Sequence, residues 1–105
     1  MTLTPIDVEL LRNALTSICD EMYLALMKSA YSTNIKERRD HSAAIFDAKG
    51  RVVIQGESQP LHLASMLGLV EVLLERYPID TLRPGDMFAS NDPFVGKGSH
   101  LPDVA

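Results

Sequence analysis

The sequence predicts an α+β (or α/β) fold: a long N-terminal helix, a β-hairpin, a second amphipathic helix, a short strand and a glycine-containing loop. Three observations support this prediction. Apolar residues recur at helical spacing over residues 5–30. Two β-rich runs flank an Asp…Gly turn that ends at Gly50. A second helical pattern begins at residue 62 and is followed by segments rich in glycine and proline.

The first helix is predicted over residues 5–30. Thr4 offers a hydroxyl N-cap, Pro5 suits the first helical position, and Asp7 is an acid near the positive end of the helix dipole. A stripe at helical spacing follows and is expected to be core: Leu11, Leu15, Ile18, Met22, Ala25, Leu26 and Ser29. A helix of this length reaches roughly 40 Å. We therefore expect it to pack on more than this chain provides.

The hairpin is predicted from residues 43–46 and 51–55, with the turn over residues 47–50. Gly50 is expected to adopt the positive φ that closes such a turn. A loop over residues 56–60 then leads into the second half of the chain.

The second helix is predicted over residues 62–76, because it is apolar at helical spacing at Leu63, Met66, Leu67, Val70, Leu73 and Leu74. A turn over residues 82–86 has Pro84 and Gly85 at its centre. Residues 87–90 are predicted to form a short strand that delivers the chain into a polar loop.

Composition excludes several classes of protein. The chain has 105 residues, of which 46% are hydrophobic and 23% charged, so it fits one folded domain at most. A net charge of -4, and a basic cluster at 36–39 with acids interleaved, argue against nucleic acid as a partner. No apolar stretch has the length of a membrane span. A single cysteine, Cys19, and the lack of a signal-peptide pattern predict a cytoplasmic protein.

The segment from Asn91 onward carries the densest chemistry. It contains Asp92, His100 and Asp103 among glycines and prolines, and the chain stops soon afterwards at Ala105. Domains rarely end on such a segment. We therefore expect residues 1–105 to be the N-terminal portion of a longer subunit, truncated at its C-terminal end.

His100 and Asp103 place an imidazole and a carboxylate three positions apart. Pro102 argues against a helix, and in an extended strand the two side chains would point to opposite faces, so they converge only across a turn. If they converge, they form half of a site of the kind that binds Zn, Mn or Fe. A hydrogen-bonded surface pair is the competing interpretation.

Other candidate residues have ordinary alternatives. The run 36–40 is either a solvated set of local ion pairs or a segment in which one carboxylate turns inward to a metal. His62 opens the second helix, where it either caps or packs against the helix, or is a site residue. In a site, its position at the helix N-terminus favours a neutral imidazole that acts as a donor or base. Cys19 has no neighbour that would lower the pKa of its thiol, and we interpret it as structural.

The order and spacing of several motifs resemble the N-terminal region of the hydantoinase B/oxoprolinase family. The match extends over nearly the whole chain, although no single motif is decisive. Lys97 is a departure, because it separates Gly96 from Gly98 where the family loop has adjacent glycines and is one residue shorter. The matching segments are 12–15, 34–42, 46–50, 59–66, 82–86, 91–94 and 100–104.

The resemblance implies ATP-dependent opening of cyclic amides such as hydantoins and 5-oxoproline, in a hetero-oligomer with a hydantoinase A-type subunit that binds ATP. It also implies a divalent metal (Mn, Zn or Mg) held by His100, Asp103 and, from the earlier segment, Glu37, with a further histidine ligand expected from outside these 105 residues. His62 and Asp92 are the candidate catalytic residues. On this interpretation the 105 residues alone are inactive.

Two other interpretations stay open at this point. Related subunits of acetone and acetophenone carboxylases carboxylate ketones instead of opening cyclic amides. A long helix followed by a hairpin also suits a non-catalytic ligand-binding or sensor domain, or a segment that only mediates assembly. Only the enzyme interpretations require His100, Asp103 and Glu37 to meet.

Overall fold

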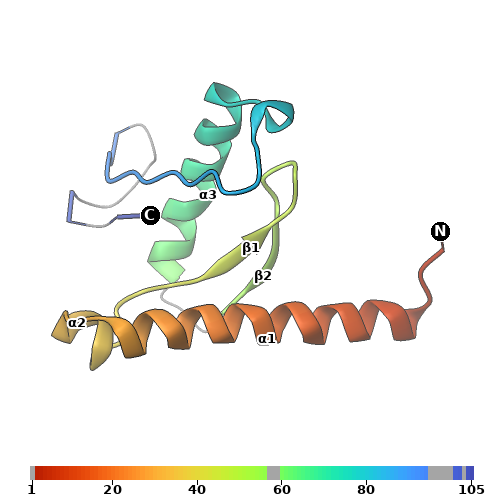
Figure 1. Ribbon diagram of the computed structural model, residues 1–105, viewed down its shortest axis with the longest axis horizontal. Coiled ribbons are helices and arrows are strands. Elements are labelled where there is room, and N and C mark those ends of the chain that lie inside the picture. Colours follow the sequence, from red (N-terminus) through yellow and green to blue (C-terminus); the bar gives the residue numbers. More distant parts are fainter. Residues whose placement is uncertain (1, 57–59, 95–100, 103) are drawn as a thin grey trace. The chain divides into compact units, whose positions relative to one another are not determined.

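The computed structural model describes residues 2–56, 60–94, 101–102 and 104–105, and in residues 60–65 and 67 the backbone only. The predicted α+β class is confirmed, with helices and a two-stranded antiparallel sheet of order β1-β2 (Figure 1). The elements are α1 (Pro5–Ser29), α2 (Thr33–Lys36), β1 (Ala44–Phe46), β2 (Val52–Gln55), α3 (Pro60–Arg76) and a 3₁₀ helix, η1 (Ile79–Thr81).

The chain divides into two compact units. The first comprises Met1–Ile45 and Val53–Gln59, and the second comprises Phe46–Val52 and Pro60–Ala105. The division passes through the hairpin, so the ends of its two strands belong to the first unit and its turn belongs to the second. None of the helices described is long and apolar enough to cross a membrane.

The start of α1 is a capping box. The hydroxyl of Thr4 accepts a hydrogen bond from the backbone N–H of Asp7 at 3.2 Å, and the backbone N–H of Thr4 donates to Asp7 Oδ2 at 2.9 Å. That backbone hydrogen bond, helped by the Thr4 hydroxyl, lowers the pKa of Asp7. With Pro5 at the first helical position, the prediction of a helix from residue 5 is confirmed.

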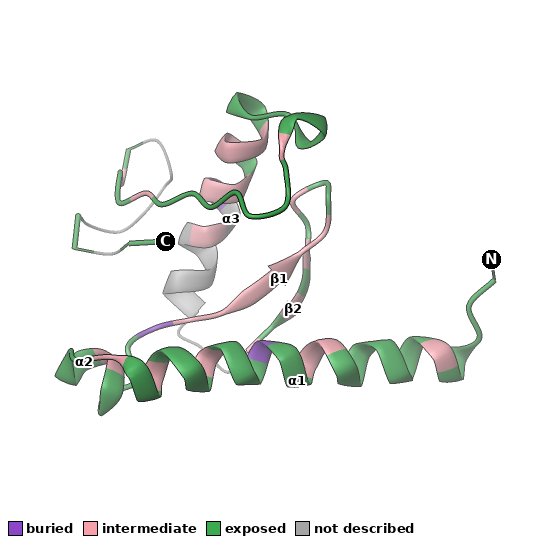
Figure 2. Ribbon diagram, viewed as in Figure 1, coloured by how far each residue is buried: buried purple, intermediate pink, exposed green. Residues whose placement is uncertain are grey.

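The apolar stripe of α1 is largely exposed, which corrects the prediction that it is core. Leu11 is 50% exposed, Ile18 48% and Met22 47%, and Cys19 is the one buried residue of this helix (Figure 2). The physical reason is that α1 is much longer than the elements that pack on it. Within the first unit a helix of 25 residues meets only short elements, and these cover the side that carries Cys19.

The segment that follows α1 contains a turn of helix that the sequence analysis did not predict. α2 spans four residues, with the N–H groups of Lys36 and Glu37 donating to the carbonyls of Ser32 and Thr33. One helical turn is too short to produce a periodic apolar pattern, so no sequence signal marks it.

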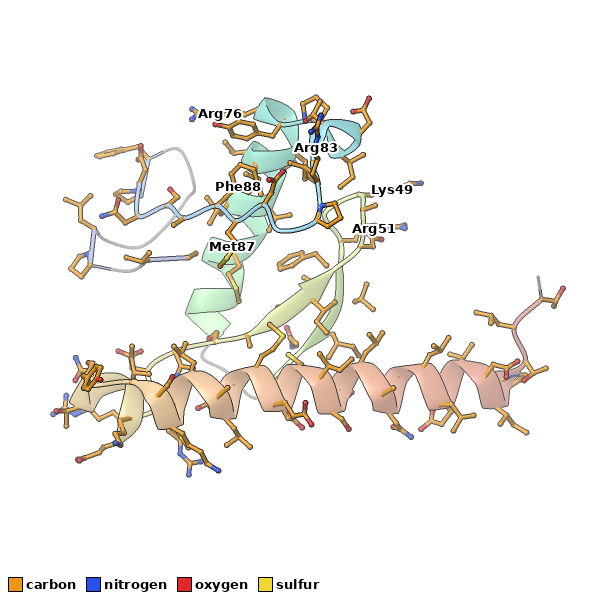
Figure 3. All side chains as sticks on the ribbon, viewed as in Figure 1. Lys49, Arg51, Arg76, Arg83, Met87 and Phe88 are labelled. Atoms are coloured by element: carbon orange, nitrogen blue, oxygen red, sulfur yellow. The ribbon has the colours of Figure 1, made fainter. Side chains whose placement is uncertain are left out.

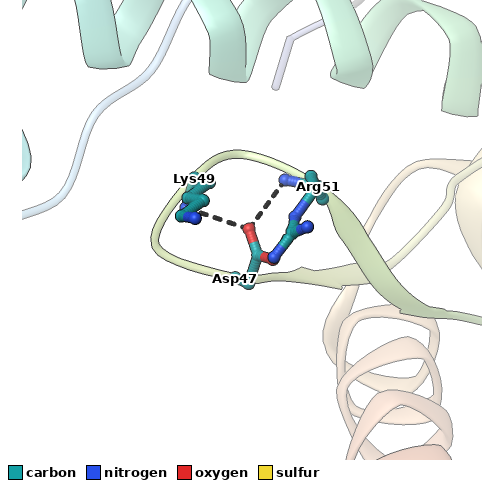
Figure 4. Close-up of polar contacts among 3 residues, drawn as sticks. All are labelled: Asp47, Lys49 and Arg51. Carbon is teal, nitrogen blue, oxygen red and sulfur yellow. Dashed lines mark hydrogen bonds and ion pairs between the residues drawn. The ribbon is translucent and has the colours of Figure 1, made fainter.

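The hairpin turn is formed as predicted. Gly50 has φ +80°, its N–H donates to Asp47 O at 3.0 Å, and the N–H of Asp47 donates to Arg51 O at 2.9 Å. The carboxylate of Asp47 fills the turn from within, accepting from the backbone N–H groups of Lys49 and Arg51 at 2.9 Å each (Figure 4). The guanidinium of Arg51 also donates to Asp47 Oδ2 at 2.7 Å.

The second unit begins with α3, which starts at Pro60, two residues before the predicted start. Proline is well tolerated in a first helical turn because its missing N–H has no helical partner there.

The predicted turn at Pro84-Gly85 is confirmed. Asp86 N donates to Arg83 O at 3.1 Å, and Gly85 has φ +96°, as the third residue of a type II turn requires.

The strand predicted over residues 87–90 does not form, and this prediction was wrong. A strand is defined by its ladder of hydrogen bonds, and within the described residues this segment pairs only at Ser90.

Candidate functional site

The chemically rich loop is closed at its base by a pair of backbone hydrogen bonds. The N–H of Ser90 donates to Ala105 O and the N–H of Ala105 donates to Ser90 O, both at 2.9 Å. This reciprocal exchange is the pattern of a hydrogen-bonded antiparallel pair. Asn91 adds a third tie, because its side-chain amide donates to Leu101 O at 3.0 Å. The two ends of the loop are therefore held together.

Asp92 lies in the first turn of this loop. Its carboxylate accepts a hydrogen bond from the N–H of Phe94 at 2.9 Å, and its own N–H donates to the hydroxyl of Ser90 at 3.3 Å. A side chain that accepts from the N–H two residues on forms an Asx-turn, which suits an Asp-Pro sequence. The residue is exposed.

The structure describes the other predicted site residues to different extents. His100 and Asp103 lie outside the described residues. His62 lies in the first turns of α3, where only the backbone is described. Glu37 is exposed at the end of α2 in the first unit, its N–H donating to Thr33 O. The meeting of Glu37 with His100 and Asp103 stays a prediction.

The described residues by themselves form no metal site. Among them, no three His, Cys, Asp or Glu side chains are grouped so that they could hold an ion. The predicted set is chemically suitable, because one imidazole with two carboxylates is a donor combination that Zn²⁺ and Mn²⁺ accept. A site of this composition depends on His100 and Asp103.

His41 is a buried polar residue that sequence reasoning did not single out. It is only 7% exposed, and its ring stacks on Tyr23 with centroids 4.0 Å apart and 17° between the planes. Its Nε2 lies 2.9 Å from Tyr23 O. A carbonyl only accepts, so Nε2 donates this hydrogen bond, and Nδ1 is buried with no hydrogen-bond partner among the described residues.

The backbone beside His41 is held in an unusual conformation. Arg39 has φ +57°, in the left-handed region that residues other than glycine seldom adopt. The hydroxyl of Tyr23 donates to Arg39 O at 3.4 Å, and the N–H of His41 donates to the same oxygen at 2.9 Å. Tyr23 thus holds residues 39–41, next to Glu37, against α1. A histidine between a charge run and an apolar strand gives no pattern from which this contact could have been found.

Cys19 is structural, as predicted. Its thiol is fully buried and donates to Ala43 O at 3.3 Å, and Gly56 leaves room for it. Burial raises the pKa of the thiol, so the reactive thiolate is disfavoured.

The second unit also contains a cavity of about 380 Å³. Apolar side chains of α3 line it together with Phe46 and Phe88, and Arg76 lies at the C-terminal end of the helix. Ser90 and Ala105, which close the loop, are part of its wall.

Comparison with known proteins agrees with the resemblance read from the motifs. Residues 4–105 match the model of the hydantoinase B/oxoprolinase family, and the chain belongs to this family. It is 39% identical over 103 residues to an uncharacterized protein of Schizosaccharomyces pombe. It is 36% identical over 104 residues to the 5-oxoprolinase of Saccharomyces cerevisiae, and 32% identical over 102 residues to the caprolactamase subunit beta of Pseudomonas jessenii.

These alignments cover 98%, 99% and 97% of the chain but only 8%, 8% and 17% of the respective relatives. The chain thus spans a small part of the length of the relatives it matches. No solved structure matches it.

Proposed function

We propose that this chain is part of an ATP-dependent cyclic-amide hydrolase of the hydantoinase/5-oxoprolinase type that uses a divalent metal. The observation that carries the proposal is the family match over residues 4–105. Two of the relatives bear the names of enzymes that open lactams, 5-oxoprolinase and caprolactamase. Neither the ketone-carboxylase nor the sensor interpretation has comparable support among these relatives.

The loop closed by Ser90 and Ala105 is the proposed centre of the chemistry. His100 and Asp103 of this loop, with Glu37, would hold a divalent metal, which supplies Lewis-acid activation of water when bound. The closed base limits how far the loop ends can spread. Asp92, whose carboxylate orients the backbone of the loop at Phe94, would position a water or the amide nitrogen.

His62 is proposed to move the proton. Its backbone lies in the first turns of α3, where the helix dipole disfavours the imidazolium form and so favours a neutral base. In ring opening, water adds to the carbonyl carbon, the C–N bond breaks, and the nitrogen leaves as an amine after receiving a proton. His62 would take a proton from the attacking water and return it to the leaving nitrogen, so that no net proton is gained or lost.

ATP is needed because a lactam carbonyl is a weak electrophile. Transfer of the γ-phosphoryl group to the amide oxygen, giving ADP, activates the carbonyl carbon for attack by water. After the C–N bond has broken, an acyl phosphate remains at that carbon, and a second water hydrolyses it to the carboxylate and phosphate. We assign this step to a hydantoinase A-type partner. A caprolactamase relative that is named as a subunit supports an assembly of more than one chain.

The test is an assay of the protein co-expressed with its ATP-binding partner. We expect release of ADP and opening of 5-oxoproline, hydantoin or caprolactam, each in stoichiometric amounts, and no fixation of labelled bicarbonate into acetone. His100→Ala and Asp103→Ala should each remove lactam opening, with Lys97→Ala as a loop control that retains most of it.

Two results would overturn the proposal in different ways. Carboxylation of acetone without lactam opening would move the protein to the ketone branch. The second result is full lactam opening by both His100→Ala and Asp103→Ala, each assayed after its metal has been removed and added back. That result would show that the loop does not hold the metal.

A further inference from the structure

The cavity of the second unit has the character of a site for a small ring compound. Its volume of about 380 Å³ lies within the range of small-molecule sites. Met66, Leu69, Val70 and Leu73 of α3 form an apolar wall, and Phe88 belongs to the lining as well. Phe88 packs against Tyr77 with ring centroids 4.9 Å apart, which fixes the aromatic side of the cavity.

Arg76 is the charged side chain of this lining. It lies in the last turn of α3, and Figure 3 shows it at one end of that helix, with Phe88 on the neighbouring segment. No hydrogen bond or ion pair of its guanidinium occurs in the described part of the chain. An apolar cavity with one guanidinium in its lining is complementary to a ligand that has an apolar body and one carboxylate.

The cavity adjoins the loop of the proposed function. Ser90 and Ala105 line it, and the same two residues exchange the hydrogen bonds that close the loop. Asn91 and Asp92 follow directly on Ser90. A ligand in the cavity would therefore lie at the base of the loop.

We propose that this cavity binds the ring of a cyclic amide that carries an acid group, and that Arg76 pairs with the carboxylate. The inference rests on the proposed function and deepens it, because the lactams of the two named relatives differ in this respect: 5-oxoproline carries a carboxylate and caprolactam does not. Arg76 then selects acid-bearing lactams over neutral ones in this protein.

The experiment is a titration of the ¹⁵N-labelled chain followed by NMR chemical shifts. The probes are 5-oxoproline, caprolactam and cyclopentanecarboxylate, which has the ring and the acid but no amide. For ligands this small we expect dissociation constants on the order of 1 mM. Shifts should centre on residues 69–77 and 88–90, with 5-oxoproline and cyclopentanecarboxylate binding more tightly than caprolactam.

Arg76→Gln should weaken binding of the two carboxylates on the order of five-fold, the size expected of one solvent-accessible charge pair, and leave caprolactam unchanged. Arg83→Gln is the matched control, because Arg83 is an arginine of the same unit that does not line the cavity. The fingerprint spectra of both variants show directly whether each one is folded.

Equal binding of acid and neutral rings, an equal effect of the two arginine variants, or no binding by any probe would each overturn the inference. The proposed function is tested separately by the assay of the complex. If the complex opens lactams but Arg76→Gln changes KM for 5-oxoproline and caprolactam alike, the inference fails and the proposed function stands. If the complex opens no lactam, the proposed function fails whatever the titration shows.

Discussion

At the level of single residues, the contacts that hold the polar segment after α2 converge on Tyr23. Its ring stacks on His41, its carbonyl accepts from His41 Nε2, and its hydroxyl donates to Arg39 O. These contacts offset the cost of a positive φ at Arg39, which is of order 1–3 kcal/mol for such conformations. The segment beside Glu37 therefore owes its shape to a side chain of α1.

Replacing His41 should separate the stacking contribution from the hydrogen bond. His41→Phe keeps the stacked ring and removes the buried nitrogen that has no partner, so we expect the free energy of unfolding to stay within about 1 kcal/mol of wild type. His41→Ala loses both contacts and should cost about 2–3 kcal/mol. Urea denaturation followed by circular dichroism measures both. Equal losses in the two variants would show that the bond from Nε2 dominates.

Asp47 should make the free energy of unfolding depend on pH in the acid range. The hydrogen bond from the backbone N–H of Arg51, followed by those from its side chain and from Lys49, lowers the pKa of Asp47 below its ordinary 3.8. A carboxyl group with a lowered pKa contributes stability above pH about 3.8, and that contribution is lost as the pH falls through the lower folded value.

We therefore expect Asp47→Asn to be less stable than wild type at pH 7 and to lose less of its remaining stability between pH 5 and pH 2. Denaturation midpoints measured across that range provide the comparison. Parallel pH profiles for the two proteins would contradict the assignment of the acid response to this turn.

At the level of elements, the local signals were reliable wherever the structure depends on near neighbours. The N-cap Thr4, with Pro5 and Asp7 after it, predicted the start of α1. The apolar spacing predicted α3, and glycines predicted the turns at Gly50 and Gly85. The elements that were missed, α2 and η1, are each about one turn long. Such turns form when the surrounding chain brings them into place, and their own residues carry little preference.

Gly50 and Gly85 both have a positive φ, but they differ in how closely other side chains surround them. Comparing them separates the backbone cost of an alanine from its steric contacts. A Cβ at Gly50 would lie 3.2 Å from Leu74 Cδ1 and 3.4 Å from Val70 Cγ1, whereas a Cβ at Gly85 would meet nothing within 4 Å. Both Gly→Ala changes incur the backbone cost of about 1 kcal/mol.

Gly50→Ala should therefore destabilise the protein more than Gly85→Ala, by up to about 1 kcal/mol where the tight contact with Leu74 has to relax. Thermal or urea unfolding of the pair is the measurement. If Gly85→Ala is the more damaging change, the packing of the hairpin turn on α3 is not what restricts residue 50.

At the level of the whole molecule, few of the described residues are buried. Cys19 is the fully buried apolar side chain among them, and large apolar residues of α1 stay about half exposed. The length of α1 predicts that it packs on more than this chain provides, and the exposed stripe is consistent with that prediction. The matched relatives are several times longer than the chain.

The metal site is a further prediction at this scale. The described residues contain no group of three ligands, and the resemblance implies a histidine ligand in addition to His100, Asp103 and Glu37. We therefore expect Zn²⁺ or Mn²⁺ to bind the 105-residue chain weakly or not at all in calorimetry. Tight binding of one ion per chain, abolished by His100→Ala, would contradict this and show that the chain holds a complete site.

The sequence by itself determined the helix caps, the two long helices, the turns and the family, because these depend on spacing along the chain and on residues a few positions apart. Tertiary structure decided the rest. Residues 87–90 lack a strand because the described chain gives them one pairing at Ser90 and no ladder. His41 is buried because residue 23 of a helix and residue 41 of a loop meet in space. Arg76 lines a cavity together with a segment more than ten residues further on. Contacts between distant residues leave no periodic trace in the sequence, and the folded chain alone brings them together.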